Sequence, residues 1–125
     1  MLEINLPDVV DEVKAVFEQY ETALIANDIS TLDQLFWQSS HTIRYGIAEN
    51  LYGYEEIANF RRLRQPTAME RELRHTTVTT YGQDLATVNT EFHRPRQAGR
   101  QSQTWMRTEA GWRVVSAHVS LMPQN

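Results

Sequence analysis

The feature that most constrains this fold is a change in apolar periodicity about halfway along the chain. Apolar residues over 9–24 recur at helical spacing, which predicts a long first helix. A second, shorter helix is expected to begin at Ser30, with Asp33 completing a capping box. A third is expected over 54–64, with Pro66 just past its end. The first half of the chain is therefore predicted to be mainly helical.

The second half alternates apolar and polar residues in the way that strands do. A short strand over 41–45 and a return segment over 48–52 come before the third helix. Four long runs follow it, joined by short turns: 70–81, 85–94, 99–108 and 112–122. Short turns between long strands favour antiparallel pairing. Helices followed by such a meander predict an α+β fold, with the helices packed on one face of a curved sheet.

Length and composition exclude several classes of protein. The 125 residues are expected to form one domain, 1–125. No apolar run approaches the roughly 18 residues that cross a bilayer, so no membrane association is predicted. The chain has no cysteine, which excludes disulfides and thiol catalysis. No secretory signal is evident, and we predict a cytoplasmic location.

The basic residues are unevenly distributed and nearly uniform in kind. Residues 1–43 hold eight acids and one base, whereas residues 44–125 hold eight acids and eleven bases, all arginine. The guanidinium fork matches a carboxylate and stays charged when partly desolvated. The pattern is either a compositional bias or the signature of an anion pocket, and the net charge of −4 disfavours nucleic acid as a partner.

Two residues stand out within the predicted elements. Tyr20 lies in the apolar stripe of the first helix, so its hydroxyl must find a partner; a packed structural ring is the alternative to a functional one. Arg44 shares one face of its strand with Thr42, and alternation alone does not decide whether that face meets the helices or solvent. An inward Arg44 would be a buried cation that requires an anion.

Four further side chains are candidates for contacting an anion. Arg61 and Arg64 lie in the last turn of the third helix, where they either serve the helix dipole or form a second clamp. Strict alternation along 112–122 places His118 and Ser120 on a face that would line a cavity. The opposite, aliphatic face of that strand suits a subunit contact, so a homo-oligomer, dimer or tetramer, is predicted.

Motifs for other chemistries are missing from the sequence. It contains no phosphate-binding glycine loop, no nucleophile elbow and no basic stripe interleaved with aromatic residues. The four histidines fall in different predicted elements without metal-ligand spacing. We therefore predict neither a metal nor a cofactor.

Several strings carry a resemblance to a known family: Leu35-Phe36-Trp37, His41 to Gly46, Glu49 to Gly53, and Ala117 to Met122. They resemble the AtzH-like family, which includes the HpxZ proteins of oxalurate catabolism, within the SnoaL-like or nuclear-transport-factor-like superfamily. The resemblance implies a cystatin-like cone, in which three N-terminal helices close a strongly curved antiparallel sheet around a pocket. Trp37 and Tyr52, which lie in these strings, join the predicted substrate contacts.

The resemblance also implies an activity. AtzH-like proteins are described as metal-free hydrolases that decarboxylate dicarboxyurea to allophanate, and the family's functional tyrosine and arginine fall on Tyr20 and Arg44. We expect Tyr20 to act as general acid and base and Arg44 to anchor a carboxylate of a small ureido anion. Dicarboxyurea, allophanate and oxalurate remain equivalent choices of ligand. A non-catalytic binding or accessory protein associated with an amidase is the alternative, and an empty dimerisation module is a third.

Overall fold

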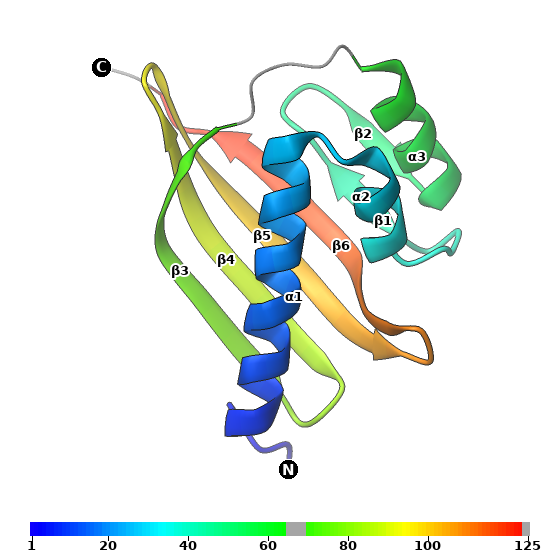
Figure 1. Ribbon diagram of the computed structural model, residues 1–125, viewed down its shortest axis with the longest axis vertical. Coiled ribbons are helices and arrows are strands. Elements are labelled where there is room, and N and C mark those ends of the chain that lie inside the picture. The colour runs from blue at the N-terminus through cyan, green and yellow to red at the C-terminus, as the bar shows by residue number, and fades with distance from the viewer. Residues whose placement is uncertain (65–69, 124–125) are drawn as a thin grey trace.

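The computed structural model describes residues 1–64 and 70–123, and it has the predicted α+β architecture (Figure 1). The helices come first and the long strands last. The elements are α1 (Pro7–Ala26), α2 (Ile29–Leu35), β1 (Ile43–Tyr45), β2 (Asn50–Tyr52), α3 (Tyr54–Leu63), β3 (Glu72–Tyr81), β4 (Leu85–Arg94), β5 (Gln97–Thr108) and β6 (Gly111–Leu121). No helix of the described residues is long and apolar enough to cross a membrane.

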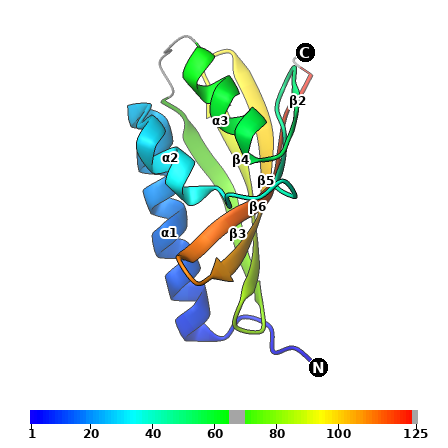
Figure 2. The same cartoon turned by 90° about the vertical axis from the view of Figure 1, so that its right-hand side faces the viewer.

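The six strands form one sheet in the order β2-β1-β6-β5-β4-β3. The four long strands pair antiparallel, as predicted. The sequence did not reveal that β1 pairs parallel with β6, which brings a strand from the first half of the chain beside the last one. All three helices lie on one side of the curved sheet, which leaves its other side uncovered (Figure 2). The core therefore lies between α1 and the helix-facing side of the long strands.

The apolar stripe of α1 is buried against the sheet, as its periodicity predicts. Val13, Phe17 and Tyr20 are among its buried residues. The helix ends where Asn27 takes a left-handed conformation with φ of 53°. Asparagine is one of the few residues that tolerate this conformation.

The start of α2 differs from the prediction. Asp28, and not Ser30, is the N-cap: its carboxylate accepts a hydrogen bond from the Thr31 backbone N–H at 3.2 Å and from the Thr31 hydroxyl at 2.7 Å. The predicted capping box of Ser30 and Asp33 is therefore wrong. The third helix ends at Leu63, and the predicted stop at Pro66 lies outside the described residues.

An acidic residue on the first turns of α1 fixes that helix to the sheet. The indole N–H of Trp112 donates to Glu12 Oε1 at 3.0 Å, and Arg107 pairs with the same carboxylate. These bonds, first that of Trp112 and then that of Arg107, lower the pKa of Glu12 below its ordinary value of 4.5. The contact connects residues that are 100 positions apart in the sequence.

A β-bulge interrupts the alternation of β6. Thr104 of β5 pairs with Ser116, but the next residue, Trp105, pairs with Val114. The intervening Val115 is therefore extra, and every side chain beyond it changes face. Val114 and Ala117 are both buried as a result, whereas His118 is exposed. The prediction of one continuous face from Trp112 to Ser120 is wrong for this reason.

Candidate active site

A cavity of about 270 Å³ opens between the C-terminal half of α1, helix α3 and the adjoining ends of the strands. This volume is just below the range of about 300–1,000 Å³ typical of sites for drug-sized ligands, so it suits a small molecule. Its polar lining comprises Tyr20, Arg44, Glu49, Arg64, Arg71, Arg94 and Gln101. Its apolar walls are Leu24, Ile47, Ala48, Phe60, Phe92 and Val119.

Tyr20 is positioned by the aromatic residues around it. Only 6% of the residue is exposed, and its ring lies 6.4 Å from that of Phe17, 6.3 Å from Phe36 and 6.2 Å from Trp105, measured between ring centroids. Its hydroxyl has no hydrogen-bond partner among residues 1–64 and 70–123. The ring is thus fixed by packing, while the polar end is available to a ligand in the cavity.

Arg44 faces the helices, which decides between the two orientations that alternation left open. Its guanidinium pairs with Glu49 at 3.2 Å and lies 5.8 Å from the centre of the Phe60 ring. Gly46 makes this pair possible, because a Cβ at that position would lie 1.7 Å from Glu49 Oε1. Arg44 therefore reaches the cavity with one carboxylate already beside it.

The two arginines predicted from the end of α3 have different surroundings. Arg64 lines the cavity and has no ion pair within the described part of the chain. Burial, then the positive charges of Arg44 and Arg61, lower the pKa of the Arg64 guanidinium.

Arg61 is only 7% exposed, pairs with Asp33 and lies 4.9 Å from the centre of the Phe36 ring. It lines a small recess of about 20 Å³ beside Tyr20 and Arg44, but not the main cavity. Its charge is already balanced, so it fits a supporting position better than the predicted direct clamp.

Sequence reasoning missed three polar residues at the other end of the cavity. Arg71 precedes β3 and pairs with Glu21 of α1, and its Nη2 donates to Gln101 Oε1 at 2.9 Å. Arg94 ends β4 and lies 5.4 Å from the centre of the Phe92 ring, with its Nε buried and without a hydrogen-bond partner in the described residues. Burial, then the charge of Arg71, lower the pKa of Arg94. Alternation was the available signal, since Arg94 lies two positions beyond the apolar Phe92.

The cavity has an excess of positive charge. Four arginines line it, but Glu49 is its one lining carboxylate among the described residues. Glu21 balances Arg71 from behind, which leaves Arg64 and Arg94 without carboxylate partners in that part of the chain. A cation removed from water without a counterion is costly. The part of the chain that the structure describes therefore gives this cavity a net positive lining.

The other predicted substrate contacts lie outside this cavity. The bulge turns His118 and Ser120 to the uncovered side of the sheet, where the His118 ring lies 5.6 Å from that of Tyr45. Tyr52 is 52% exposed and lies edge-on to Tyr45 on the same side. Trp37 stacks on His41 at a ring distance of 6.4 Å, beside a different hollow.

The same bulge removes the basis on which a subunit contact was predicted. Ala117 is buried and Val119 lines the cavity, so these aliphatic side chains face the helices and not a neighbouring subunit. Association into a homo-oligomer stays a prediction, but the aliphatic face of β6 no longer supports it.

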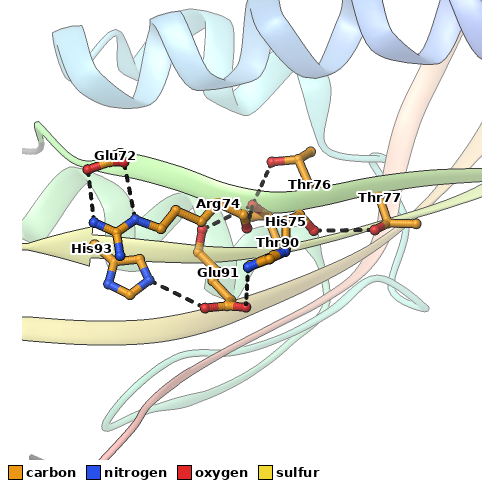
Figure 3. A network of polar contacts seen from close by, with 8 residues as sticks. All are labelled: Glu72, Arg74, His75, Thr76, Thr77, Thr90, Glu91 and His93. Atoms are coloured by element: carbon orange, nitrogen blue, oxygen red, sulfur yellow. Dashed lines mark hydrogen bonds and ion pairs between the residues drawn. The ribbon is translucent and has the colours of Figure 1, made fainter.

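A second group of titratable residues lies on β3 and β4 (Figure 3). Glu91 lies between two histidines, 3.9 Å from His75 and 3.4 Å from His93, while Arg74 pairs with Glu72 at 3.1 Å. Exposed pairs of this kind contribute at most about 1 kcal/mol. No group of three or more histidine, cysteine, aspartate or glutamate residues within 1–64 and 70–123 is arranged to hold a metal ion. The side chains of this network bind one another along two strands, and the arginine cavity is the stronger candidate.

The fold places the chain in a structural class, the cystatin-like α+β proteins. Within that class the chain belongs to the AtzH-like family, whose model matches residues 2–125.

Three solved structures illustrate these relationships. A protein of unknown function from Pectobacterium atrosepticum is 51% identical with a TM-score of 0.94, and the match covers 96% of this chain and 95% of that one. A cystatin-like fold protein from Burkholderia xenovorans is 46% identical with a TM-score of 0.95, covering 100% of both chains.

The third is a candidate dehydratase of the nuclear-transport-factor-2-like family from Streptomyces avermitilis. It is 18% identical with a TM-score of 0.77, and the match covers 94% of this chain and 98% of that one. At that identity it establishes the fold alone. No curated protein matches the chain. The comparisons thus give the family and a fold that is also used by enzymes, without a reaction.

Proposed function

We propose that this protein is a small, metal-free hydrolase or decarboxylase that acts on a carboxylated urea of the dicarboxyurea, allophanate or oxalurate type. Tyr20 is the general acid and base of the proposed reaction, and Arg44 anchors a carboxylate. The observation that carries the proposal is the cavity itself, where a tyrosine hydroxyl with no partner among residues 1–64 and 70–123 lies among four arginines. Membership of the AtzH-like family supports the choice of a ureido anion.

The proposed step can be written for dicarboxyurea, which carries a carboxylate on each nitrogen. The Tyr20 hydroxyl donates its proton to one nitrogen. The bond between that nitrogen and its carboxylate carbon then breaks, the electron pair stays on nitrogen, and the carboxylate leaves as carbon dioxide. Allophanate remains, and the tyrosine regains a proton from water. Positioned proton transfer of this kind is worth about 10²–10⁴ in rate.

The Arg44–Glu49 pair suits the carboxylate that leaves. A carboxylate that becomes neutral carbon dioxide loses its attraction to a cation as the reaction proceeds, so a very strong ion pair would stabilise the ground state over the transition state. Glu49 already neutralises part of the Arg44 charge at 3.2 Å. Arg44 can therefore orient this carboxylate beside Tyr20 while holding it only moderately.

The experiment that tests the proposal is a turnover assay on purified protein with dicarboxyurea, allophanate and oxalurate, read as released carbon dioxide and ammonia. We expect carbon dioxide release from at least one of the three, and we expect Arg44→Gln to raise the KM for that substrate. The variant lacks the cation that contacts the carboxylate, so the substrate is less well oriented beside Tyr20 and kcat should also fall. Release at the uncatalysed rate from all three substrates would exclude a hydrolase of this class.

A binding or accessory protein associated with an amidase is the second candidate, favoured by one observation. Arg64 and Arg94 make the cavity attractive to anions whether or not Tyr20 transfers a proton. A binder would show no turnover but would be stabilised by the same ligands, because a ligand that binds only the folded state raises its melting temperature. Thermal melting with each of the three compounds, run beside the turnover assay, separates the two functions.

A further inference from the structure

The cavity has a second polar group, separate from Tyr20 and Arg44, contributed by three neighbouring strands. Arg71 lies immediately before β3, Arg94 is the last residue of β4, and Gln101 lies in β5. All three line the same cavity as Tyr20. The proposed reaction at Tyr20 and Arg44 leaves this group without a role.

Arg71 fixes which end of the Gln101 side chain is available. Gln101 is only 3% exposed, and its Oε1 accepts a hydrogen bond from Arg71 Nη2 at 2.9 Å. Arg71 is itself held by both oxygens of Glu21. The other amide atom, Gln101 Nε2, is consequently a fixed donor, and it has no partner in the described residues. A buried donor without a hydrogen bond costs free energy, and a ligand oxygen that accepts from it would recover that free energy.

Arg94 supplies a cation near the same aromatic ring as Arg71. The Arg71 and Arg94 guanidinium carbons lie 4.9 and 5.4 Å from the centre of the same Phe92 ring, so both are gathered around one side chain. The charge of Arg71 is balanced by Glu21, whereas Arg94 has no carboxylate partner among residues 1–64 and 70–123. Its Nε is buried and unpartnered as well. The group therefore presents one uncompensated positive charge and two unsatisfied donors.

The two ends of the cavity are electrostatically distinct. At one end Glu49 pairs with Arg44, and at the other end Glu21 pairs with Arg71. Among the described residues, neither Arg64 nor Arg94 has an ion pair of its own. One small anion at Tyr20 would leave the charge of Arg94 unpaired.

We propose that Arg94 and Gln101 form a second carboxylate subsite, which selects ligands with an acidic group at each end of a short planar spacer. The inference rests on the proposed function, since it assigns the carboxylate that is retained while the one beside Tyr20 is lost. Arg94 pairs with that carboxylate, and Gln101 Nε2 donates to one of its oxygens. A ligand with one carboxylate can satisfy only one end of the cavity and binds more weakly.

The test uses two probes that differ by one carboxylate, dissolved immediately before titration because β-keto carboxylates lose carbon dioxide on standing. 3-Oxoglutarate has the skeleton of dicarboxyurea with CH₂ in place of NH, and acetoacetate is the corresponding monoanion. Isothermal titration at pH 7.5 and fixed ionic strength should give wild-type protein at least about tenfold higher affinity for 3-oxoglutarate. Arg94→Gln should weaken 3-oxoglutarate binding by about 10- to 150-fold, the range for a charge-assisted hydrogen bond. It should change acetoacetate binding by less than about threefold.

Two more variants keep the result interpretable. Arg100→Gln removes an equal charge from the exposed face of β5, next to Gln101 in sequence, and should leave both affinities unchanged. Gln101→Met retains the side-chain length but lacks the donor, so it should weaken 3-oxoglutarate selectively even if Arg94→Gln fails to fold. Melting curves without ligand verify folding.

The possible outcomes separate this inference from the proposed function. Equal wild-type affinity for both probes, or an equal loss of both in Arg94→Gln, would overturn the second subsite while leaving Tyr20 and Arg44 in place. A wild-type protein that binds neither probe would overturn the anion site itself, and with it the proposed function.

Discussion

Replacing Tyr20 by phenylalanine tests the centre of the proposed reaction, because the structure separates the packing of this ring from the use of its hydroxyl. The ring contacts with Phe17, Phe36 and Trp105 are retained by phenylalanine. The hydroxyl has no hydrogen-bond partner within the described residues, so its removal forfeits no protein–protein bond. The free energy of unfolding should therefore change by less than about 1 kcal/mol. For a chain of this length that corresponds to less than about 4 °C in Tm.

The kinetic effect should be much larger than the effect on stability. Loss of a general acid costs about 10²–10⁴ in kcat, which corresponds to about 2.7–5.5 kcal/mol in the activation free energy. The assay is carbon dioxide release from dicarboxyurea, with a melting curve on the same sample. Tyr81→Phe is the matched control, because the Tyr81 hydroxyl bonds to Thr87 at 3.1 Å, away from the cavity. It should lose about 0.5–1.5 kcal/mol of stability and no turnover. Full turnover in folded Tyr20→Phe would refute the assignment of the proton donor.

Other parts of the structure make separate predictions. Asp33→Asn should lower the free energy of unfolding by about 1–3 kcal/mol in a denaturant titration, because Arg61 is buried and loses its counterion; unchanged stability would mean that this pair contributes nothing. Gly99→Ala should lower stability by a similar amount and weaken binding of 3-oxoglutarate, since the new Cβ would lie 2.2 Å from Phe92 in the cavity wall; wild-type affinity would show that the wall adjusts. Glu12→Gln should be less stable than wild type at pH 7, and the difference in Tm should shrink as the pH falls from about 5 to 3. The pKa of Glu12 is depressed below 4.5, so its contribution is present above that value and is lost on protonation; a difference of unchanged size at pH 3 would contradict this. Dialysis against a chelator should leave the rate of carbon dioxide release unchanged, because the proposed reaction uses side chains alone, and a loss restored by added metal would contradict it.

The order of elements could be predicted from sequence because each long element follows one period over many residues. The helical stripe of α1 and the limits of β4 illustrate this. What could not be predicted is where a period breaks. Val115 is an ordinary strand residue, and only the pairing of its neighbours, Val114 and Ser116, with β5 shows that it is the extra residue of a bulge. One such residue reverses the faces of His118 and Ser120, which is why those two predicted contacts lie outside the cavity.

A site residue could be predicted where the pattern of its own helix or strand marks it as buried. Tyr20 lies in a buried stripe, and the structure places it in the cavity. The orientation of Arg44 depends on the partner of β1. That partner is β6, and because the two strands are distant in the sequence, local patterns could not reveal the pairing. Arg71 and Arg94 are separated by a whole hairpin, so no spacing rule connects them. Their proximity follows from the register of β3 on β4, in which Leu73 is opposite Phe92.

The arginines of this chain fall into two groups: those that pair with a carboxylate, and those that line the cavity without one in the described residues. Arg61, Arg71 and Arg107 each meet a carboxylate, and each connects two elements that are distant in sequence. That is the arrangement expected where a buried or half-buried cation serves the fold, because the partner offsets the desolvation of the charge. Arg64 and Arg94 line the cavity without such a partner in the described residues, and burial lowers the pKa of both. In the proposed function, the counterion that Arg64 and Arg94 lack is the anionic ligand that enters the cavity.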